Sequence, residues 1–455
     1  MKKTVQLFSA LTLSLLGSCV FAAASSTELA KLGTTLTPMG AEKAGNADGS
    51  IPEWSGGLPK DAAPVDAQGF LGDPYAGEKP LFVITAQNAE QYKDKLAEGQ
   101  LAMFKRYPGT FKMPVYPSHR SVGMPQDIYA ATHVSAEKVS LLDGGTGLKG
   151  FSESRVFAFP IPNNGLEVVW NHITRYKGGN VLRESTNAFP QKNGDYTLVR
   201  MRDQVAFPFW LADMPQDKGE NTLLVFKSVT TSPARLAGNV LLVHDTLDQV
   251  REPRMAWQYN PGQRRVRRAP QVAYDSPGSN ADGTRTSDDF DMYNGAPDRY
   301  DWTLIGKREV YIPYNNYKLA SPSLKYADIL QSGHTNQDLA RYELHRVWVV
   351  EGDLKKDKRH VYAKRRFYID EDSWTIVASE MYDGRGQLWR VGQAMHLHEY
   401  NAQTPWYAFE AVYDLISGRY GVYGMINEEK NWVKFGIQAS AKEYTPAALR
   451  TAGVR

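Results

Sequence analysis

The chain has 455 residues, of which 42% are hydrophobic and 23% charged, a composition typical of a soluble globular protein. Its 53 Lys and Arg residues nearly balance its 50 Asp and Glu residues, which argues against a general nucleic-acid or membrane-surface binder. The single cysteine, Cys19, lies in the leader described next, so the mature chain is expected to have no disulfide and no thiol chemistry.

The first residues have the pattern of a secretory signal. Lys2 and Lys3 precede an apolar run from Leu7 to Val20, which is too short to span a bilayer comfortably. Small residues at 22–24 offer a cleavage site, and we expect residues 1–24 to be removed. The residues before Cys19 loosely resemble a lipoprotein cleavage box, but the apolar run continues beyond it, so simple release is favoured over lipidation. The expected location is the periplasm.

Residues 25–150 are predicted to form an N-terminal strap followed by helices. Residues 25–80 are rich in Gly, Pro and Ala with little periodicity, and Ile51 and Trp54 are the apolar anchors that would hold this strap to the surface. Apolar spacing predicts one helix from Thr85 to Phe104 and a second from Gln126 to Leu142.

The pattern then changes to strands. β-Branched and aromatic residues predict five of them before a hairpin: 154–159, 166–176, 196–201, 222–229 and 239–245. The hairpin runs from Met255 to Arg268 around an Asn-Pro-Gly turn. A turn-rich loop over 274–297 leads to a strand at 300–313, and residues 322–340 are predicted to be a helical or loop insertion.

The stretch from Tyr342 to Gln393 carries the strongest strand pattern. Four runs rich in β-branched and aromatic residues are joined by short acidic or Gly-containing turns, which predicts an antiparallel meander. One side of this sheet is broad, aromatic and apolar, so helices, another sheet or a ligand must cover it. Strands at 396–400, 406–414 and 419–425 extend the sheet, and residues 442–455 are predicted to be a terminal helix. The division into domains is 1–24, 25–150, 151–425 for the sheet, and 426–455 for the tail.

Metal binding is considered for two groups of residues. His396 and His398 alternate in a strand, but no third ligand follows from the sequence, which favours two surface or half-buried histidines. Asp288, Asp289 and Asp291 lack the ligand spacing of a calcium loop, and turns in a solvated loop are favoured. We therefore assign no metal site and no cofactor.

The sequence contains no motif that requires catalysis. It has no Gly-x-Ser-x-Gly elbow, no dinucleotide fingerprint and no phosphate loop. The basic run Arg264-Arg-Val-Arg-Arg could bind an acidic partner, but a solvated strand arm is favoured. We therefore predict that the protein is not an enzyme.

Several motifs resemble an exported Gram-negative family of unknown function that is labelled "outer membrane lipoprotein-sorting protein". The similar segments are Ala30-Lys-Leu-Gly-Thr-Thr-Leu-Thr-Pro, Gly45-Asn-Ala-Asp-Gly-Ser-Ile-Pro-Glu-Trp, Trp170-Asn-His-Ile-Thr-Arg-Tyr, Phe290-Asp-Met-Tyr-Asn-Gly and Tyr300-Asp-Trp. A more distant likeness to the lipoprotein carriers LolA and LolB is confined to the hairpin and to the meander around Tyr368–Leu388.

This resemblance implies a mainly β (α+β) fold, a large antiparallel half-open barrel of LolA/LolB type with a few covering helices. It also implies a role in outer-membrane biogenesis, working with a pump of the resistance-nodulation-division type and an outer-membrane partner. Residues 25–150 and the tail after about residue 400 have no counterpart in the lipoprotein carriers.

The predicted function is periplasmic binding and transfer of a lipid, lipoprotein or other apolar molecule between the two membranes. The residues expected to line its cavity have apolar neighbours on their strands; they are Trp257, Tyr259, Trp302, Trp348, Phe367 and Trp374. Two alternatives stay open: a scaffold for a pump or outer-membrane protein, and an ester hydrolase. An exposed apolar patch would favour the scaffold, and a nucleophile beside a base would favour the hydrolase.

Overall fold

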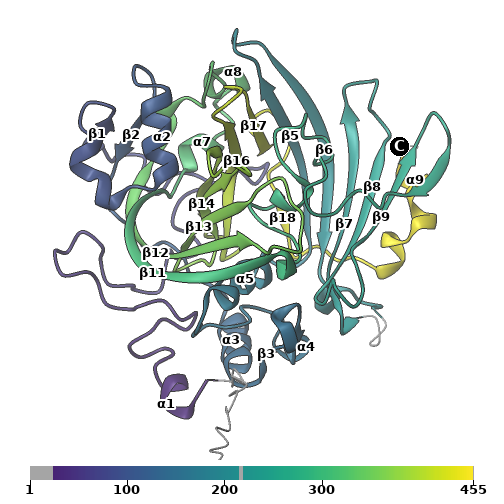
Figure 1. The fold of residues 1–455 in the computed structure, drawn as a ribbon, viewed down its shortest axis with the longest axis horizontal. Helices are drawn as coiled ribbons and strands as arrows, with labels where there is room; N and C mark the ends of the chain where they lie inside the picture. Colours follow the sequence, from purple (N-terminus) through teal and green to yellow (C-terminus); the bar gives the residue numbers. More distant parts are fainter. Residues whose placement is uncertain (1–23, 215–218, 454–455) are drawn as a thin grey trace, which may run out of the picture.

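A computed structural model describes residues 24–214 and 219–453, so the predicted leader lies outside the described residues (Figure 1). Within that part of the chain, sixteen strands form one sheet, in which every strand pairing except that of β2 with β12 is antiparallel. No helix there is both long enough and apolar enough to cross a membrane. The sheet consists of two meanders, one after the other in sequence.

The first meander occupies the right half of Figure 1. Consecutive strands pair in the order β5 to β10. Their bounds are β5 Val181–Pro190, β6 Tyr196–Ala206, β7 Thr222–Ser232, β8 Val240–Thr246, β9 Met255–Asn260 and β10 Arg265–Arg268. The strands predicted at 196–201, 222–229 and 239–245 and the 255–268 hairpin are confirmed.

The second meander begins with the long, bent strand β11 that sweeps across the lower part of Figure 1. Its strands are β11 Tyr300–Pro313, β12 Tyr342–Leu354, β13 Lys364–Asp370, β14 Ile376–Tyr382, β15 Leu388–Glu399, β16 Thr404–Asp414 and β17 Tyr420–Met425. The predicted meander from Tyr342 to Gln393 is confirmed as β12 to β15, and the later strands extend it as expected.

The two meanders join at their free edges. The last strand, β17, pairs with the first strand, β5, through Val422 and Ala188, and the short β18 (Lys434–Phe435) also pairs with β5. At the other end, β1 (Phe82–Thr85) and β2 (Lys112–Val115) attach to β12. The product is a mainly β, half-open antiparallel sheet, as predicted. The two strands β3 (Ser140–Leu141) and β4 (Leu148–Lys149) form a separate pair.

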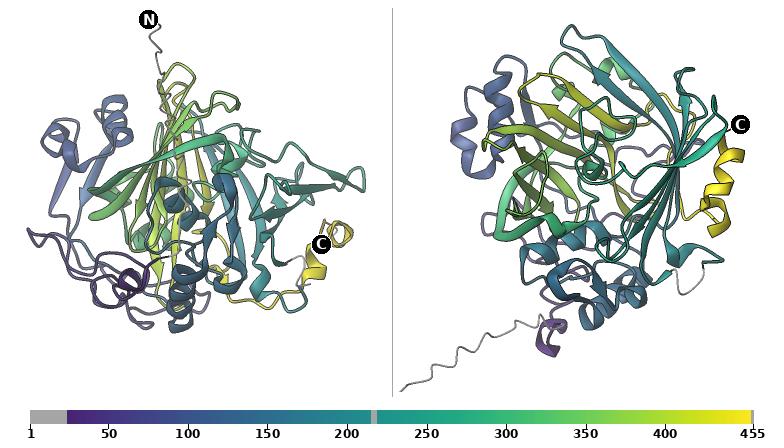
Figure 2. Two further views of the ribbon diagram at one scale, coloured as in Figure 1. Left: turned by 60° about the horizontal axis from the view of Figure 1, so that its bottom comes forward. Right: turned by 45° about the vertical axis from the view of Figure 1, so that its right-hand side comes forward.

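The helices are short and lie at the ends and faces of the sheet (Figures 1 and 2). The α-helices are α1 Ser26–Leu29, α2 Glu98–Arg106, α3 Gln126–Lys138, α4 Phe151–Ser154, α5 Gly165–Thr174, α7 Tyr317–Ala320, α8 Tyr326–Ile329 and α9 Leu449–Gly453. The 3₁₀ helices are η1 Ala89–Lys95, η2 Asp143–Gly145, η3 Pro208–Trp210, η4 Ser287–Asp289, η5 Pro297–Arg299, η6 Gln337–Leu339, η7 Ala441–Tyr444 and η8 Pro446–Ala448.

The strand predicted at 166–176 is wrong, because this segment forms α5. The side chain of Asn164 accepts a hydrogen bond from the Glu167 amide at 3.0 Å and caps the helix. Nine of the ten α5 residues are buried, including Glu167 and Asn171. Its short run of β-branched and aromatic residues, Val168–Trp170 and Ile173, is typical of a strand, and periodicity cannot distinguish a buried strand from a buried helix over so few residues.

Two further expectations need correction. The strand predicted at 154–159 is instead the end of α4 and a loop in which Arg155 and Phe157 have positive φ angles of 74° and 40°. The helix predicted from Thr85 to Phe104 is divided into β1, η1 and α2, because residues 86–88 turn and Leu96 is extended. The second predicted helix ends at Lys138, where β3 follows.

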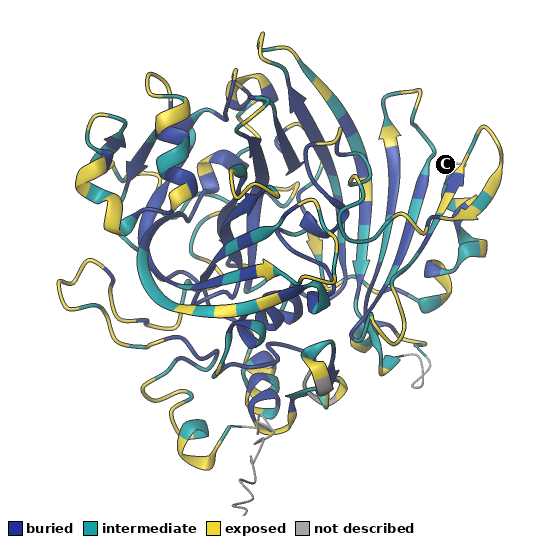
Figure 3. Ribbon diagram, in the orientation of Figure 1, coloured by how far each residue is buried: buried dark blue, intermediate teal, exposed yellow. Residues whose placement is uncertain are grey.

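Both faces of the second meander are packed over most of β12–β17, which Figure 3 shows as dark blue strands, whereas the edge strand β11 is largely half-buried or exposed before Val310. One face packs against α2, β1, β2 and the segments around α7 and α8, and its core includes Met103, Met113 and Phe409. The other face packs against α5 and α3 and includes Val168, Trp374 and Ile376. Helices and loops therefore cover the broad aromatic side of this sheet.

Candidate functional site: a cavity in the first meander

A cavity of about 440 Å³ lies against β5–β9 of the first meander. A loop over residues 272–294 crosses this face and closes one side of the cavity, and Tyr407, Glu410 and Tyr423 of β16 and β17 contribute to its wall. Its volume falls in the range of small-molecule binding sites. The apolar part of the wall consists of Leu224, Phe226, Leu241, Val243, Val272 and Phe290.

Strand alternation explains why this face is free and the other is not. On β7, residues Leu224, Phe226, Ser228 and Thr230 line the cavity, whereas the buried Val225 and Val229 point the other way. The opposite face packs against the C-terminal segment, including Tyr444 and Leu449. Figure 1 shows α9 in yellow outside β8 and β9. The C-terminal segment therefore packs on one face of the first meander, and the cavity lies on the opposite face.

Buried ion pairs form the polar part of the cavity wall. Arg183 pairs with Asp203 at 3.2 Å and donates to the Tyr407 hydroxyl at 2.6 Å. Arg285 pairs with Glu410 at 3.3 Å. Arg254 pairs with Asp245. The wall thus joins an apolar surface to a polar surface, which suits an amphipathic ligand better than a purely apolar one.

Two carboxylate oxygens in this wall have no hydrogen-bond partner. They are Oδ1 of Asp203 and Oε1 of Glu410, and both residues are buried. Burial raises the pKa of Glu410 to about 7, against the opposing effect of Arg285.

A second cavity of about 480 Å³ lies between α5 and η3. It has an aromatic wall, formed by Phe151, Tyr176, Phe207, Phe209 and Trp210. Phe209 is 50% exposed, and the Arg155 guanidinium lies 3.1 Å from its ring centroid.

A charged cluster lies at the C-terminal end of α5, beside this second cavity. Arg175 and Lys177 both pair with Asp291, the latter at 3.5 Å. Burial and the nearby Arg175 lower the pKa of Lys177 to about 8, and the same two causes lower the pKa of His172 to about 3. His172 is therefore neutral at pH 7, and Nδ1 accepts from the Ile376 amide at 3.0 Å.

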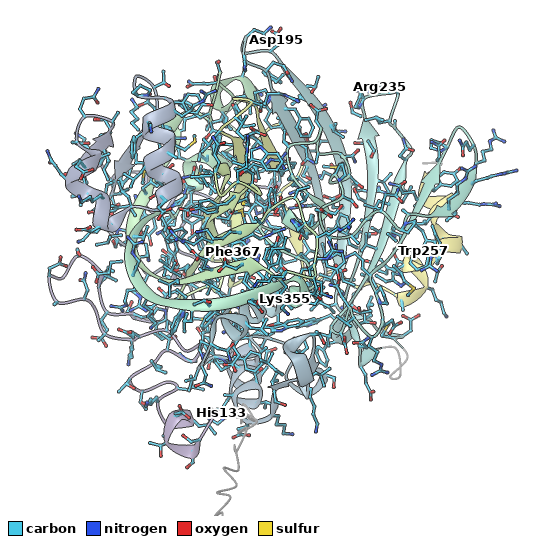
Figure 4. The ribbon with its side chains drawn as sticks, in the orientation of Figure 1. His133, Asp195, Arg235, Trp257, Lys355 and Phe367 are labelled. Carbon is cyan, nitrogen blue, oxygen red and sulfur yellow. The ribbon has the colours of Figure 1, made fainter. Side chains whose placement is uncertain are left out.

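The residues predicted to line a cavity lie in two places. Trp257 and Tyr259 are on β9; Tyr259 borders the 440 Å³ cavity, and its ring packs against Gly453. Figure 4 shows Trp257 on the α9 side of the sheet and Phe367 in the second meander.

The other four residues gather in the core beneath the second meander. Phe367 stacks on Trp302 at 5.6 Å, and Trp348 stacks on Trp374 at 6.2 Å. Phe367 and Trp374 are fully buried, whereas Trp302 and Trp348 are half-buried at the edge of the same core. Their role as ligand contacts stays a prediction.

The sequence analysis missed the residues of β5–β8 and of the 272–294 loop. The alternation in Thr222–Ser232 was available as a signal, but nothing in it distinguishes a cavity from a packed face. Asp288 and Asp289, considered for calcium, instead pair with the buried Arg365 at 2.7 and 3.1 Å. The arginines of β10 are exposed, which agrees with the solvated strand arm favoured from the sequence.

His396 and His398 are fully buried, whereas the sequence favoured surface or half-buried positions. Burial lowers the pKa of His398 to about 3. Among the described residues, His345, Asp370 and Asp372 form the one group of three or more His, Cys and carboxylate side chains whose ligand atoms all lie within 4.8 Å of one another.

The sheet and its cavity define a half-open antiparallel β protein with a ligand-sized site. The chain belongs to the family described as "protein of unknown function (DUF1329)", whose model matches residues 83–450. It is 61% identical over 445 residues to an uncharacterized protein of Pseudomonas aeruginosa, covering 98% of this chain and 97% of that one. The family resemblance noted in the sequence is thereby confirmed.

Three solved structures are similar at low identity. A protein from Vibrio parahaemolyticus described as an outer membrane lipoprotein-sorting protein domain is 14% identical, with a TM-score of 0.44, and 63% of this chain and 98% of that chain are covered. A DUF1329 protein from Desulfovibrio piger is 14% identical, with coverages of 60% and 92% and a TM-score of 0.40. A LolA superfamily protein from Nitrosomonas europaea is 12% identical, with coverages of 62% and 98% and a TM-score of 0.38.

Proposed function

We propose that this protein is a periplasmic, non-enzymatic carrier that binds an amphipathic ligand in the 440 Å³ cavity of the first meander. The ligand's apolar part would lie against β7 and β8, and its polar part against the ion pairs around Asp203 and Glu410. Transfer between the inner and outer membranes is part of this proposal. So is cooperation with a resistance-nodulation-division pump and an outer-membrane partner, as the family resemblance implies.

The observation that supports the proposal is the division of the cavity wall. Phe226 on β7 and Phe290 on the crossing loop have ring centroids 5.2 Å apart and provide a continuous apolar surface. Each CH₂ group buried there contributes about 0.8 kcal/mol. The ion pairs Arg183–Asp203, Arg285–Glu410 and Arg254–Asp245 provide the polar part of the wall. Binding therefore needs no covalent step.

The first test asks what the protein carries. The full-length protein, expressed with its leader and purified from the periplasm, is examined by native mass spectrometry and lipid extraction. We expect a bound amphipathic molecule of defined mass. Recovery of protein without any bound molecule, together with no binding of a fluorescent acyl probe, would contradict the proposal.

The second test places the ligand in this cavity. Ser228 is buried and lines the wall, so Ser228→Trp should fill part of the cavity and reduce acyl-probe affinity at least about tenfold. Arg267→Trp introduces the same side chain on the exposed strand β10 and should leave affinity unchanged. Both variants are checked by circular dichroism. Equal probe affinities in the two folded variants would place the ligand elsewhere.

A further inference from the structure

The tight turn between β13 and β14 brings two carboxylates beside a histidine of β12. Asp370 and Asp372 stand on this turn, and their oxygens and a ring nitrogen of His345 all lie within 4.8 Å of one another. The turn is held by backbone hydrogen bonds between Asp370 and Thr375 and between Trp374 and Asp370, both 2.9 Å. All three side chains with ligand chemistry are buried. The group lies away from the proposed cavity, on the second meander.

The histidine is oriented by a further carboxylate. His345 Nε2 lies 3.0 Å from Glu343 Oε2, which leaves Nδ1 as the ring nitrogen available to a ligand. Glu343 is itself fixed, because it accepts from Asn315 at 2.9 Å and from the His119 amide at 2.8 Å. The Tyr314 ring stacks on the imidazole at 3.8 Å. A carboxylate that holds the far nitrogen of a histidine is the usual arrangement behind a metal-binding imidazole.

The two aspartates are held in different ways. Asp372 accepts two hydrogen bonds from Arg120, at 2.7 and 2.9 Å, and each of its oxygens keeps a second lone pair. Asp370 Oδ2 accepts from the Ser373 amide at 2.9 Å and from the Ser373 hydroxyl at 2.6 Å. Asp370 Oδ1 is buried and has no hydrogen-bond partner.

Charge distinguishes Asp370 from its neighbours. Glu371 pairs with Arg346 at 2.6 Å and Lys307 at 2.8 Å, and Asp372 pairs with Arg120. Within the described part of the chain, no Lys, Arg or His forms an ion pair with Asp370. A buried carboxylate normally has a cation or a metal beside it, because desolvation penalises its charge.

We propose that His345, Asp370 and Asp372 bind one divalent transition-metal ion, of the Zn²⁺ or Mn²⁺ class. One imidazole nitrogen with carboxylate oxygens suits these ions better than Ca²⁺ or Mg²⁺, which prefer oxygen ligands throughout. The ion would hold the 370–375 turn to β12. Arg120, which donates to Asp372 on this turn, also donates to the carbonyls of Glu42 and Lys43. The site would therefore stabilise the N-terminal strap as well.

The experiment measures metal content and metal-dependent stability of the purified mature chain. After treatment with a chelator and its removal, ZnCl₂, MnCl₂, CaCl₂ or MgCl₂ is added, and thermal unfolding and bound metal are recorded. We expect about one Zn²⁺ or Mn²⁺ per chain and a rise in Tm of several degrees, with little effect of Ca²⁺ or Mg²⁺. No stoichiometric metal and no Tm rise in the wild-type chain would overturn the proposal.

Variants separate a metal from a proton on Asp370. Asp370→Asn and His345→Gln should each remove the metal-dependent rise in Tm and lower metal content at least tenfold. Glu399→Gln is the matched control, because Glu399 is also fully buried with one oxygen lacking a partner but lies outside this group. It should keep the metal response. If Asp370→Asn kept the response, or if all the chains responded equally, the ligand assignment would be wrong.

Discussion

The described residues include many charged side chains that lie in the interior. Arg365 is fully buried, pairs with Asp288 and Asp289, and lies among the rings of Tyr293, Tyr300 and Tyr362. The interior of this sheet is therefore held by specific polar contacts as well as by apolar packing. Such contacts favour one arrangement, because removing a single partner leaves a buried charge uncompensated.

Glu399 gives a prediction at the residue scale. It is fully buried and accepts from Trp432 Nε1 at 2.7 Å, and burial raises its pKa to about 8. The folded state therefore keeps this proton while the unfolded chain loses it above its ordinary pKa of 4.5. The stability from Glu399 is fully present below pH 4.5, falls as pH rises, and reaches its minimum near pH 8.

Glu399→Gln should remove this dependence. Relative to the wild type, the variant should gain little at pH 4 and a few kcal/mol at pH 8, at about 1.4 kcal/mol per pKa unit. Urea unfolding at both pH values measures the difference, with Glu53→Gln at an exposed position as control. A difference that does not change with pH would show that folding leaves the pKa of Glu399 unchanged.

At the scale of the element, α5 is the helix on which the second meander packs. It contacts β11 and β12, and its first residue approaches the β11 backbone closely. A Cβ atom at Gly165 would lie 2.8 Å from the Thr303 carbonyl carbon and 2.9 Å from the Leu304 amide nitrogen. Backbone atoms cannot move aside as a flexible side chain can, so this position requires glycine.

Gly165→Ala should therefore destabilise the protein by about 1–3 kcal/mol, although alanine favours helices in general. Gly384→Ala, in open space at the β14–β15 turn, should change stability little. Denaturant unfolding monitored by tryptophan fluorescence compares the two. An unchanged midpoint for Gly165→Ala would mean that α5 shifts freely on β11.

At the scale of the whole molecule, the C-terminal tail determines which face of the first meander is available. Residues 439–449 pack on Val225, Val229 and Leu242, opposite the cavity. The second meander has no equivalent free face, because segments from both the N-terminal region and the centre of the chain cover it. In this one sheet, the second meander is packed on both faces over most of β12–β17, whereas the first meander has a cavity on one face.

Leu449→Ala should loosen this cover, because the residue is fully buried in the tail core. A large-to-small change of this kind costs about 2–5 kcal/mol. Faster amide hydrogen exchange should appear in β8 and β9, whereas the second meander should keep its protection. Ile416→Ala, at a residue that is 50% exposed, is the control. Uniform loss of protection across the sheet would contradict an independent role of the tail.

The sequence by itself determined the strands of both meanders except β5, because alternating β-branched and aromatic residues with short turns are local signals. Strand β5 (Val181–Pro190) was not predicted. The sequence also determined the family. It failed for α5, where the β-branched and aromatic residues Val168–Trp170 and Ile173 gave the pattern of a strand although the segment is a helix. It predicted an aromatic face that something must cover, and left open whether the cover was helix or ligand.

Only the tertiary structure shows which sheet face is covered by protein segments and which face has a cavity. Trp374 and Phe367 are packed in a core that includes α5, while the cavity lies on β5–β9, where the tail occupies the opposite face. The reason is physical: α5 and the C-terminal tail, which cover these faces, lie more than a hundred residues from the strands on which they pack. Local patterning carries no information about which distant segment packs there. The same holds for His345 and Asp370, which are 25 residues apart in sequence and meet only because β12 pairs with β13.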